Sequence, residues 1–402
     1  MSTTRKTPKL RFPEFTDDWE QRKLGDITDS FSGGTPKVGN EEYYGGEIPF
    51  IRSAEINSST TELYITKKGL DNSSAKMVSK GTILYALYGA TSGECGISQI
   101  DGAINQAILA IKPKCGYVPY FISTWLRRSK FSIVSTFLQG GQGNLSGEIV
   151  KNLSLMLPCQ NEQKKIGELF KKLDSTITLH QRELDSLKKL KKSLLQKMFP
   201  KNGEKIPELR FPEFTGDWEQ RKLSDIGNII TGSTPSTKDK NNYNGDFLFV
   251  SPADIQGNRF VEKTITTLSE LGFKKGRILA PKSTLFVSIG STIGKVAQIR
   301  DFAVTNQQIN SIEPFKDIDP DFVFSLMQKE SPSIRCLSAT QAVPILNKTT
   351  FSNVEVSIAS NINEQYRIGE LFIKLDSTIT LHQRELDTLK KLKKGLLQNM
   401  FV

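Results

Sequence analysis

A 39-residue stretch that occurs twice decides the fold of this chain: NEQKKIGELFKKLDSTITLHQRELDSLKKLKKSLLQKMF at Asn161–Phe199 and NEQYRIGELFIKLDSTITLHQRELDTLKKLKKGLLQNMF at Asn363–Phe401. The two copies agree at 33 of 39 positions. The first copy contains no Pro and, apart from Gly167 near its start, no Gly, and it is rich in Lys, Leu, Glu and Gln, which favour helices. Each copy is therefore predicted to form one long helix.

Apolar residues recur in both copies with heptad spacing, at eight of the ten seam positions of each helix. This pattern predicts a coiled coil. A single helix of this kind would expose its apolar stripe, so the two copies are expected to pair within the chain. The predicted seam residues are Ile166, Phe170, Leu173, Ile177, His180, Leu184, Leu187, Leu194 and Met198 in the first copy and Ile368, Phe372, Leu375, Ile379, His382, Leu386, Leu389, Leu396 and Met400 in the second.

The two helices are expected to run antiparallel, because only this pairing relates the halves by a pseudo-twofold axis while separating the attached domains. His180 and His382, the only histidines, lie at the helix midpoints and should then approach each other. Their simplest role is a polar layer that fixes the register. At 1.5 Å per residue each helix spans about 58 Å, or one and a half turns of B-DNA, so the pair could space two DNA-binding domains. The alternative is a coiled coil that only joins domains or dimerises.

A second repeated segment, Leu10–Leu24 and Leu209–Leu223, differs at one position in fifteen. Residues 200–208 join the first helix to the second of these segments, and Val402 with residues 1–9 would join Phe401 to Leu10. The chain thus resembles a ring cut once, and its ends are predicted to lie close together. The predicted domains are 1–24 (shared N-terminal segment), 25–157 (first variable domain), 158–199 (central shared helix), 200–223 (linker and repeated segment), 224–358 (second variable domain) and 359–402 (C-terminal shared helix).

The two variable domains share short motifs although they differ elsewhere. GGTPK (33–37) corresponds to GSTPS (232–236), GATSG (89–93) to GSTIG (290–294), and INQAILAI (104–111) to TNQQINSI (305–312). Short β-branched runs broken by Gly, Pro and Asn predict strands and turns, and residues 117–138 and 319–337 are predicted helices. The expected fold is α+β: two mixed α/β domains separated by two long antiparallel coiled-coil helices, pseudo-twofold and circularly organised.

The net charge of +11 indicates a polyanionic partner, and most of it lies on the repeated helices. Residues 161–199 carry 10 Lys and Arg against 5 Asp and Glu, whereas residues 25–157 carry 12 against 11 and residues 224–358 carry 14 against 13. No stretch approaches the roughly 20 apolar residues of a membrane span, and the first ten residues lack a signal-peptide core, so a cytoplasmic location without membrane contact is expected. Neither disulfides nor a metal site is expected from two histidines and four scattered cysteines: Cys95, Cys115, Cys159 and Cys336.

Motifs for catalysis are missing from the sequence. There is no Walker A sequence and no Asn/Asp-Pro-Pro-aromatic motif of amino-methyltransferases. Gly140–Gly143 follows a predicted helix and is interpreted as a turn. The repeated Asp18–Lys23 and Asp217–Lys222 contain acidic residues and lysine, as nuclease sites do, but they open each repeat and indicate a scaffold or docking role. No catalytic residue and no bound metal are therefore predicted.

The duplicated order of these motifs resembles the specificity subunits of type I restriction-modification enzymes. The resemblance rests above all on Leu157-Pro158 running into Asn161–Ile166 and on its second copy, Asn363–Ile368, and it covers essentially the whole chain. It implies two target-recognition domains, each reading half of an asymmetric split site in double-stranded DNA, in a subunit that is not itself catalytic. It also implies two modification subunits that bind S-adenosylmethionine and methylate adenine N6, and restriction subunits that use ATP and Mg²⁺, with no cofactor bound by this chain.

One departure from the family pattern concerns a candidate DNA contact. Lys295 fits the family's usual basic residue, whereas the first domain has Glu94 at the matching place. Polar residues near the shared turns are the candidate DNA contacts, because Arg and Lys suit guanine edges and Asn and Gln suit adenine edges. They are Ser32, Thr35, Lys37, Arg52, Thr91, Ser92, Gln142 and Asn144 in the first domain, and Ser233, Thr234, Ser236, Lys238, Ser291, Thr292, Lys295 and Gln341 in the second. Taken singly, each is also a common turn former or phosphate contact.

Three other classes of protein are weighed against this hypothesis. A free-standing two-headed DNA-binding regulator would bind one sequence tightly without partners. A structural adaptor would show no sequence preference even in a complex. A single-chain enzyme comes last, for want of motifs.

Overall fold

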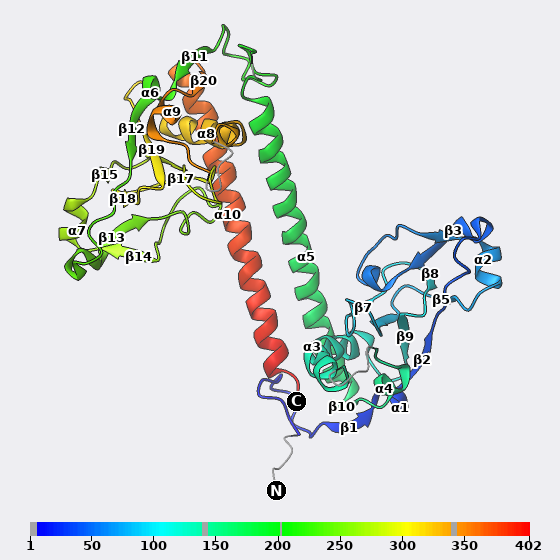
Figure 1. Cartoon of the computed structure of the whole chain (residues 1–402). Helices are drawn as coiled ribbons and strands as arrows, with labels where there is room; N and C mark the ends of the chain where they lie inside the picture. The colour runs from blue at the N-terminus through cyan, green and yellow to red at the C-terminus, as the bar shows by residue number, and fades with distance from the viewer. Residues whose placement is uncertain (1–5, 139–143, 202, 339–343) are drawn as a thin grey trace. The chain divides into compact units, whose positions relative to one another are not determined.

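The repeat in the sequence becomes a repeat of structural elements in the computed structural model, which describes residues 6–138, 144–201, 203–338 and 344–402 (Figure 1). The chain divides into two units, one formed by residues 1–179 with 386–402 and the other by residues 180–385. Each unit therefore combines one variable domain with parts of both repeated helices. In the described part of the chain, no helix is both long and apolar enough to cross a bilayer.

Between Lys6 and the first long helix, the described residues of the first half (6–138 and 144–159) form ten strands and four short or medium helices. The strands are β1 (Glu20–Lys23), β2 (Thr28–Ser32), β3 (Tyr44–Ile51), β4 (Tyr64–Ile65), β5 (Lys76–Val78), β6 (Ile83–Ala86), β7 (Cys95–Ile97), β8 (Gly102–Ile104), β9 (Ile108–Pro113) and β10 (Ser154–Leu157). The helices are α1 (Leu24–Ile27), α2 (Lys67–Asp71), α3 (Pro119–Phe137), α4 (Gly147–Lys151) and the long α5 (Gln160–Lys197), with 3₁₀ turns at Glu41–Tyr43 and Ser53–Glu55.

The second half repeats this order almost element for element. Its strands are β11 (Glu219–Lys222), β12 (Gly227–Thr231), β13 (Tyr243–Val250), β14 (Thr266–Leu268), β15 (Ile278–Leu279), β16 (Thr284–Val287), β17 (Val296–Gln298), β18 (Ala303–Thr305), β19 (Ile309–Pro314) and β20 (Glu355–Ile358). Its helices are α6 (Leu223–Ile226), α7 (Glu270–Lys275), α8 (Pro320–Cys336), α9 (Lys348–Ser352) and the long α10 (Ile362–Asn399), with a 3₁₀ turn at Lys240–Asn242. The predicted helices at 117–138 and 319–337 are confirmed as α3 and α8.

Each variable domain is built on two four-stranded sheets, as the mixed α/β prediction requires. In the first domain the orders are β2-β9-β6-β7 and β4-β3-β8-β5, and in the second they are β12-β19-β16-β17 and β14-β13-β18-β15. Among the strands of the described ranges, the pairs β3 with β8 and β13 with β18 are parallel and the others are antiparallel. A two-stranded sheet in each half, β1-β10 or β11-β20, joins the repeated segment to the strand that precedes the long helix.

The central strands are apolar on both faces because each face meets a different core. Along β6, Ile83 and Tyr85 pack in the cluster that contains α3, whereas Leu84 and Ala86 pack towards the second sheet. The alternation follows from the two-residue period of a strand. In β16 the same division places Phe286 in the helix-containing cluster and Leu285 and Val287 in the other.

In both units α5 and α10 pair antiparallel, as predicted. In the first unit, Ile166 and Phe170 near the start of α5 share a core cluster with Met400 and Phe401 at the end of α10. In the second unit, Met198 and Phe199 share a cluster with Ile368 and Phe372. The pairing therefore buries the apolar stripe that a single helix would expose.

None of the eighteen predicted seam residues is exposed in the structure. By contrast, four leucines of the same helices that lie outside the seam are 48–56% exposed: Leu179, Leu190, Leu381 and Leu392. The two lysines that interrupt the apolar seam make ion pairs between the helices. Lys393 Nζ lies 2.5 Å from Asp174 Oδ1, and Lys191 Nζ lies 2.5 Å from Asp376 Oδ1. The breaks in the heptad pattern thus carry polar contacts that favour one register.

The predicted ring is confirmed by matching contacts at its two joints. The Leu10 N–H donates to the Asn399 carbonyl, and the Leu209 N–H donates to the Lys197 carbonyl, both at 2.8 Å. A cluster of four aromatic rings closes each joint. The clusters consist of Trp19, Phe121, Phe170 and Phe401 in the first unit and Trp218, Phe322, Phe372 and Phe199 in the second.

A buried ion pair fixes each repeated N-terminal segment to the start of a long helix. Arg11 Nε lies 2.7 Å from Glu162 Oε1, and Arg210 Nε lies 2.7 Å from Glu364 Oε1. Both glutamates are fully buried. A buried carboxylate without a partner destabilises the folded state, so each arginine stabilises the fold by pairing with its glutamate.

Candidate nucleic-acid interface

Four segments of the first variable domain meet at one place, although they lie far apart in the sequence. The Thr35 hydroxyl, in the loop after β2, donates to Gln106 Oε1 in the loop between β8 and β9. The Leu87 N–H, at the end of β6, donates to the Ala107 carbonyl at 2.8 Å. The Leu145 N–H in turn donates to the Leu87 carbonyl. Polar turn residues from four segments are thereby gathered together.

The second variable domain gathers the corresponding segments in the same way. The Thr234 hydroxyl donates to Gln307 Oε1 at 2.5 Å. The Ser288 N–H donates to the Gln308 carbonyl, and the Leu346 N–H donates to the Ser288 carbonyl, both at 2.8 Å. The shared motifs therefore build the same arrangement of loops in each domain, which we call the loop platform. It comprises residues 33–37, 87–93, 105–107 and 144–145 in the first domain and residues 232–236, 288–294, 306–308 and 345–346 in the second.

Glycine is needed at two kinds of position in this platform. At Gly232 a Cβ atom would lie 2.1 Å from the Asn306 carbonyl oxygen, so no side chain fits where the first loop crosses the second. At Gly290 the backbone φ of 97° is one that side chains other than glycine rarely adopt. The recurring glycines of the motifs thus have a steric cause.

Most of the candidate residues in the first domain lie on this platform. Thr35, Lys37 and Asn144 are exposed, while Ser32, Thr91 and Ser92 are half-buried. The Ser92 hydroxyl donates to the Gly89 carbonyl at 3.0 Å, a contact within the turn. Gln142 lies outside the described residues.

Arg52 is the candidate whose geometry least favours a base contact. Its guanidinium lies 3.0 Å from Glu55 Oε1 and 2.7 Å from Glu62 Oε2, and its Nε donates to Glu55 Oε2. Burial would raise the pKa of the Glu55 carboxyl, but hydrogen bonds from Arg52 and from backbone N–H groups lower it to about 2. A contact with DNA would require Arg52 to give up these bonds, so its position favours a role in holding residues 52–62.

In the second domain the candidates again divide between exposed and internally bonded groups. Thr234, Ser236, Lys238 and Ser291 are exposed, and Thr292 is half-buried. The Ser233 hydroxyl accepts from the Arg277 N–H, and Lys295 Nζ donates to the Ile255 carbonyl at 2.9 Å. Gln341 lies outside the described residues.

A basic hollow in the second unit lies beside Lys295. It is lined by Lys188, Lys191 and Lys192 of α5, by Lys295, and by polar groups that include Gln256 and Gln328. Clustered lysines attract DNA phosphates, which provide much of the affinity of protein–DNA complexes. In the first unit Glu94 stands where Lys295 would be and pairs with Lys130.

Two glutamines of the Asn-Gln loops are candidate contacts that were not predicted from the sequence. Gln106 and Gln307 are exposed, and each accepts the hydrogen bond of a candidate threonine. The signal that could have found them was the Asn-Gln pair that follows a strand in both domains. Since glutamine can bond to an adenine edge, both join the candidate set.

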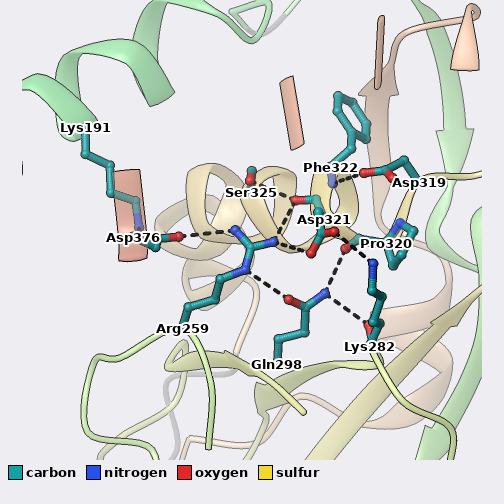
Figure 2. Close-up of polar contacts among 10 residues, drawn as sticks. All are labelled: Lys191, Arg259, Lys282, Gln298, Asp319, Pro320, Asp321, Phe322, Ser325 and Asp376. Carbon is teal, nitrogen blue, oxygen red and sulfur yellow. Dashed lines mark hydrogen bonds and ion pairs between the residues drawn. The ribbon is translucent and has the colours of Figure 1, made fainter. Parts of the chain in front are cut away.

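The second domain is attached to the long helix by a buried arginine, shown in Figure 2. Arg259 is 3% exposed, and its guanidinium lies 2.7 Å from Asp321 Oδ1 of α8 and 3.2 Å from Asp376 Oδ2 of α10. Its Nε donates to Gln298 Oε1, and its guanidinium carbon lies 4.3 Å from the centre of the Phe324 ring. These contacts join the segment between β13 and β14 to β17, α8 and α10 within this unit.

The first domain uses a different arginine for the same task. Asp174, which matches Asp376 in the repeat, lies 2.7 Å from Arg127 Nη1 of α3 and accepts a hydrogen bond from Tyr120. Burial would raise the pKa of the Asp174 carboxyl, but the bonds from Lys393 and Tyr120 and the charge of Arg127 lower it below its ordinary value. The helix carboxylate is common to both units, whereas its partner from the domain is not.

Comparisons with known proteins agree with this arrangement. The family model described as the type I restriction modification DNA specificity domain matches twice, at residues 16–189 and 215–391. The MjaIX type I specificity subunit of Methanocaldococcus jannaschii is 24% identical, covering 95% of this chain and 92% of the relative. The HindI specificity subunit of Haemophilus influenzae is 23% identical, covering 84% and 89%. In fold, the chain is similar to the solved S subunit of a type I restriction-modification system from M. genitalium, with a TM-score of 0.73 and 16% identity over 98% of this chain and 99% of that one.

Proposed function

Because this chain belongs to the type I restriction-modification DNA specificity family, as a specificity subunit with two such domains, we propose that it reads an asymmetric bipartite DNA site. Each domain would read one half-site, and the paired helices would set the gap between them. The observation that carries this proposal is a common loop platform bearing different side chains. Lys295 in the second domain and Glu94 in the first occupy matching positions on equivalent turns.

The chemistry of the candidate residues suits the reading of bases. Exposed hydroxyl, amide and amino groups converge at the platform, and such groups distinguish base pairs in the major groove. The variable domains are nearly neutral in sequence, so phosphate contacts would have to come largely from the helices and from partner subunits. Weak DNA binding by the isolated chain is therefore part of the proposal.

We further propose that the repeated surfaces dock two copies of a modification subunit, which methylates adenine N6 and carries S-adenosylmethionine. The proposal is supported by exposed residues that recur in both halves of the chain, because two similar surfaces can each bind one copy of the same partner. The strands β1 and β11 have the same sequence, EQRK, and are mostly exposed. Exposed leucines also recur at matching helix positions, Leu179 with Leu381 and Leu190 with Leu392. Restriction subunits, with their ATP and Mg²⁺, would join the same complex.

The test is to express the chain with its modification subunit in a host without other adenine methylation and to map N6-methyladenine. We expect one motif with two defined parts of different sequence separated by undefined bases. Methylation at a single uninterrupted motif would contradict the proposal. Tight sequence-specific binding by the purified chain alone, without partners, would favour a free-standing regulator instead.

A further inference from the structure

The two histidines meet across the helix pair, within the second unit. His180 Nδ1 of α5 lies 3.4 Å from His382 Nδ1 of α10. Their ring centres are 5.6 Å apart, and each side chain is 23% exposed. The two nitrogens thus face each other at a place that small solutes can reach.

Two glutamates complete this cluster in a crosswise arrangement. Glu385 Oε2 lies 3.6 Å from His180 Nδ1, and Glu183 Oε2 lies 3.7 Å from His382 Nδ1. Each glutamate also lies 4.0 Å from the histidine of its own helix. The sequence His-Gln-Arg-Glu, present in both helices, explains the geometry, because residues three apart lie on the same helix face.

The distances fit a bound ion better than direct hydrogen bonds. The contacts of 3.4–4.0 Å exceed the usual 2.7–3.2 Å of N–H···O bonds, yet all of them converge on the same two nitrogens. Around a tetrahedral Zn²⁺, with metal–nitrogen bonds of about 2.0–2.1 Å, ligand atoms are separated by about 3.3–3.4 Å. The two imidazole nitrogens already stand at this separation.

We propose that His180, His382 and Glu385 form a binding site for a divalent transition-metal ion of the Zn²⁺ class. The ligand atoms of these three residues all lie within 4.8 Å of one another. Glu183 lies within reach as a fourth ligand. Two imidazoles select Zn²⁺, Co²⁺, Ni²⁺ or Cu²⁺ over Mg²⁺ and Ca²⁺, and two carboxylates balance the charge of a dication.

An ion at this position would crosslink α5 and α10. Its ligands come from both helices, so binding would stabilise their pairing in a fixed register. This role goes beyond DNA recognition and does not depend on it, since the site is built from helix residues alone.

The experiment uses the full chain, stripped of metal with a chelator and titrated with Co²⁺ while visible absorption is recorded. We expect one Co²⁺ per chain with the intense bands of tetrahedral coordination, and displacement by Zn²⁺. His382→Asn and Glu385→Gln should each weaken binding by more than the about 10–100-fold that follows loss of an outer-shell partner. The exposed Asp185→Asn on α5 serves as the control and should bind as the unaltered chain does.

A second readout guards against loss of folding in the histidine variant. Zn²⁺ should raise the melting temperature of the unaltered chain and of Asp185→Asn, but not that of Glu385→Gln, whose changed side chain is 45% exposed. The proposal is overturned if Co²⁺ does not bind, if it binds equally to His382→Asn and Glu385→Gln, or if the spectrum shows thiolate ligation by the free cysteines.

Discussion

An aspartate of the repeated helix is present in both units, but its arginine partner differs between them. Asp174 and Asp376 occupy the same place in the repeated helix, and each pairs with a lysine of the opposite helix. Yet the first domain supplies Arg127 from helix α3, whereas the second supplies Arg259 from the segment between β13 and β14.

This difference indicates how the variable domains can diverge on a constant frame. Each long helix carries an aspartate, Asp174 or Asp376, and the variable domain is held to the helix by an arginine that pairs with this carboxylate. Loop sequences are then free to change, as long as the platform of shared turns is kept. The comparison predicts that domains are exchangeable units.

The largest effect is expected from an exchange of domains. Replacing residues 25–157 by a second copy of residues 224–358 would bring a second Arg259 to the frame, where Asp174 stands in place of Asp376. The proposed function then predicts a symmetric target with two like half-sites in inverted orientation. Mapping of methylated adenines checks this, and retention of the original asymmetric motif would contradict the account.

The two arginines should differ in their contribution to stability. Arg259→Met leaves the buried carboxylates of Asp321 and Asp376 with one partner fewer each. This should lower the free energy of unfolding by about 3–5 kcal/mol. Arg127→Met should cost less, because the side chains of Arg127 and Asp174 keep 25% and 19% exposure. Calorimetric unfolding measures both, with the exposed Lys263→Ala as control. Equal losses at the two sites would show that burial does not distinguish them.

The platform glutamines should have smaller effects, confined to one half-site each. Gln307→Ala should reduce discrimination at one base position of the second domain's half-site by about 1–3 kcal/mol, and Gln106→Ala should do so in the other half-site. Methylation rates on targets altered one base at a time provide the measurement. A uniform loss on every target would instead identify a backbone contact, and Gln99→Ala, away from the platform loops, is the control.

The smallest effect concerns acid stability of the first unit. Because the pKa of Asp174 is lowered in the fold, its stabilising contribution is present above its unfolded pKa and disappears as the pH falls through the folded value. The unaltered chain should therefore have a higher melting temperature than the Asp174→Asn variant at neutral pH. The difference between the two melting temperatures should shrink below about pH 4. A difference independent of pH would mean that the charge of Asp174 is not what stabilises the unit.

Much of the frame could be predicted from the sequence because its signals are local or repeated. The heptad spacing identified the seam, and the similar lengths of the two joints, nine and ten residues, predicted the ring that the hydrogen bond between Leu10 and Asn399 closes. The strand pairings could not be predicted, because the parallel β3–β8 and β13–β18 contacts join segments far apart in the chain.

Individual polar contacts were harder to predict than the frame. Arg259 lies in the sequence Gly-Asn-Arg-Phe, which is typical of a surface turn, and only the packing of α8 and α10 buries it. No metal site was predicted, because the sequence has only two histidines and they lie 202 residues apart. The antiparallel pairing brings the second histidine and the glutamates into range.

The central claim is that the paired helices set the distance between two half-sites. It is tested by inserting one heptad into both helices: a duplicate of residues 173–179 after Leu179 and a duplicate of residues 386–392 before Leu386. Seven residues add about 10.5 Å, so the undefined gap in the methylated motif should lengthen by about three base pairs with both half-sites unchanged. The same insertion after Gly203, in the linker, should leave the gap as it was. An unaltered gap in the helix-insertion variant would contradict the account.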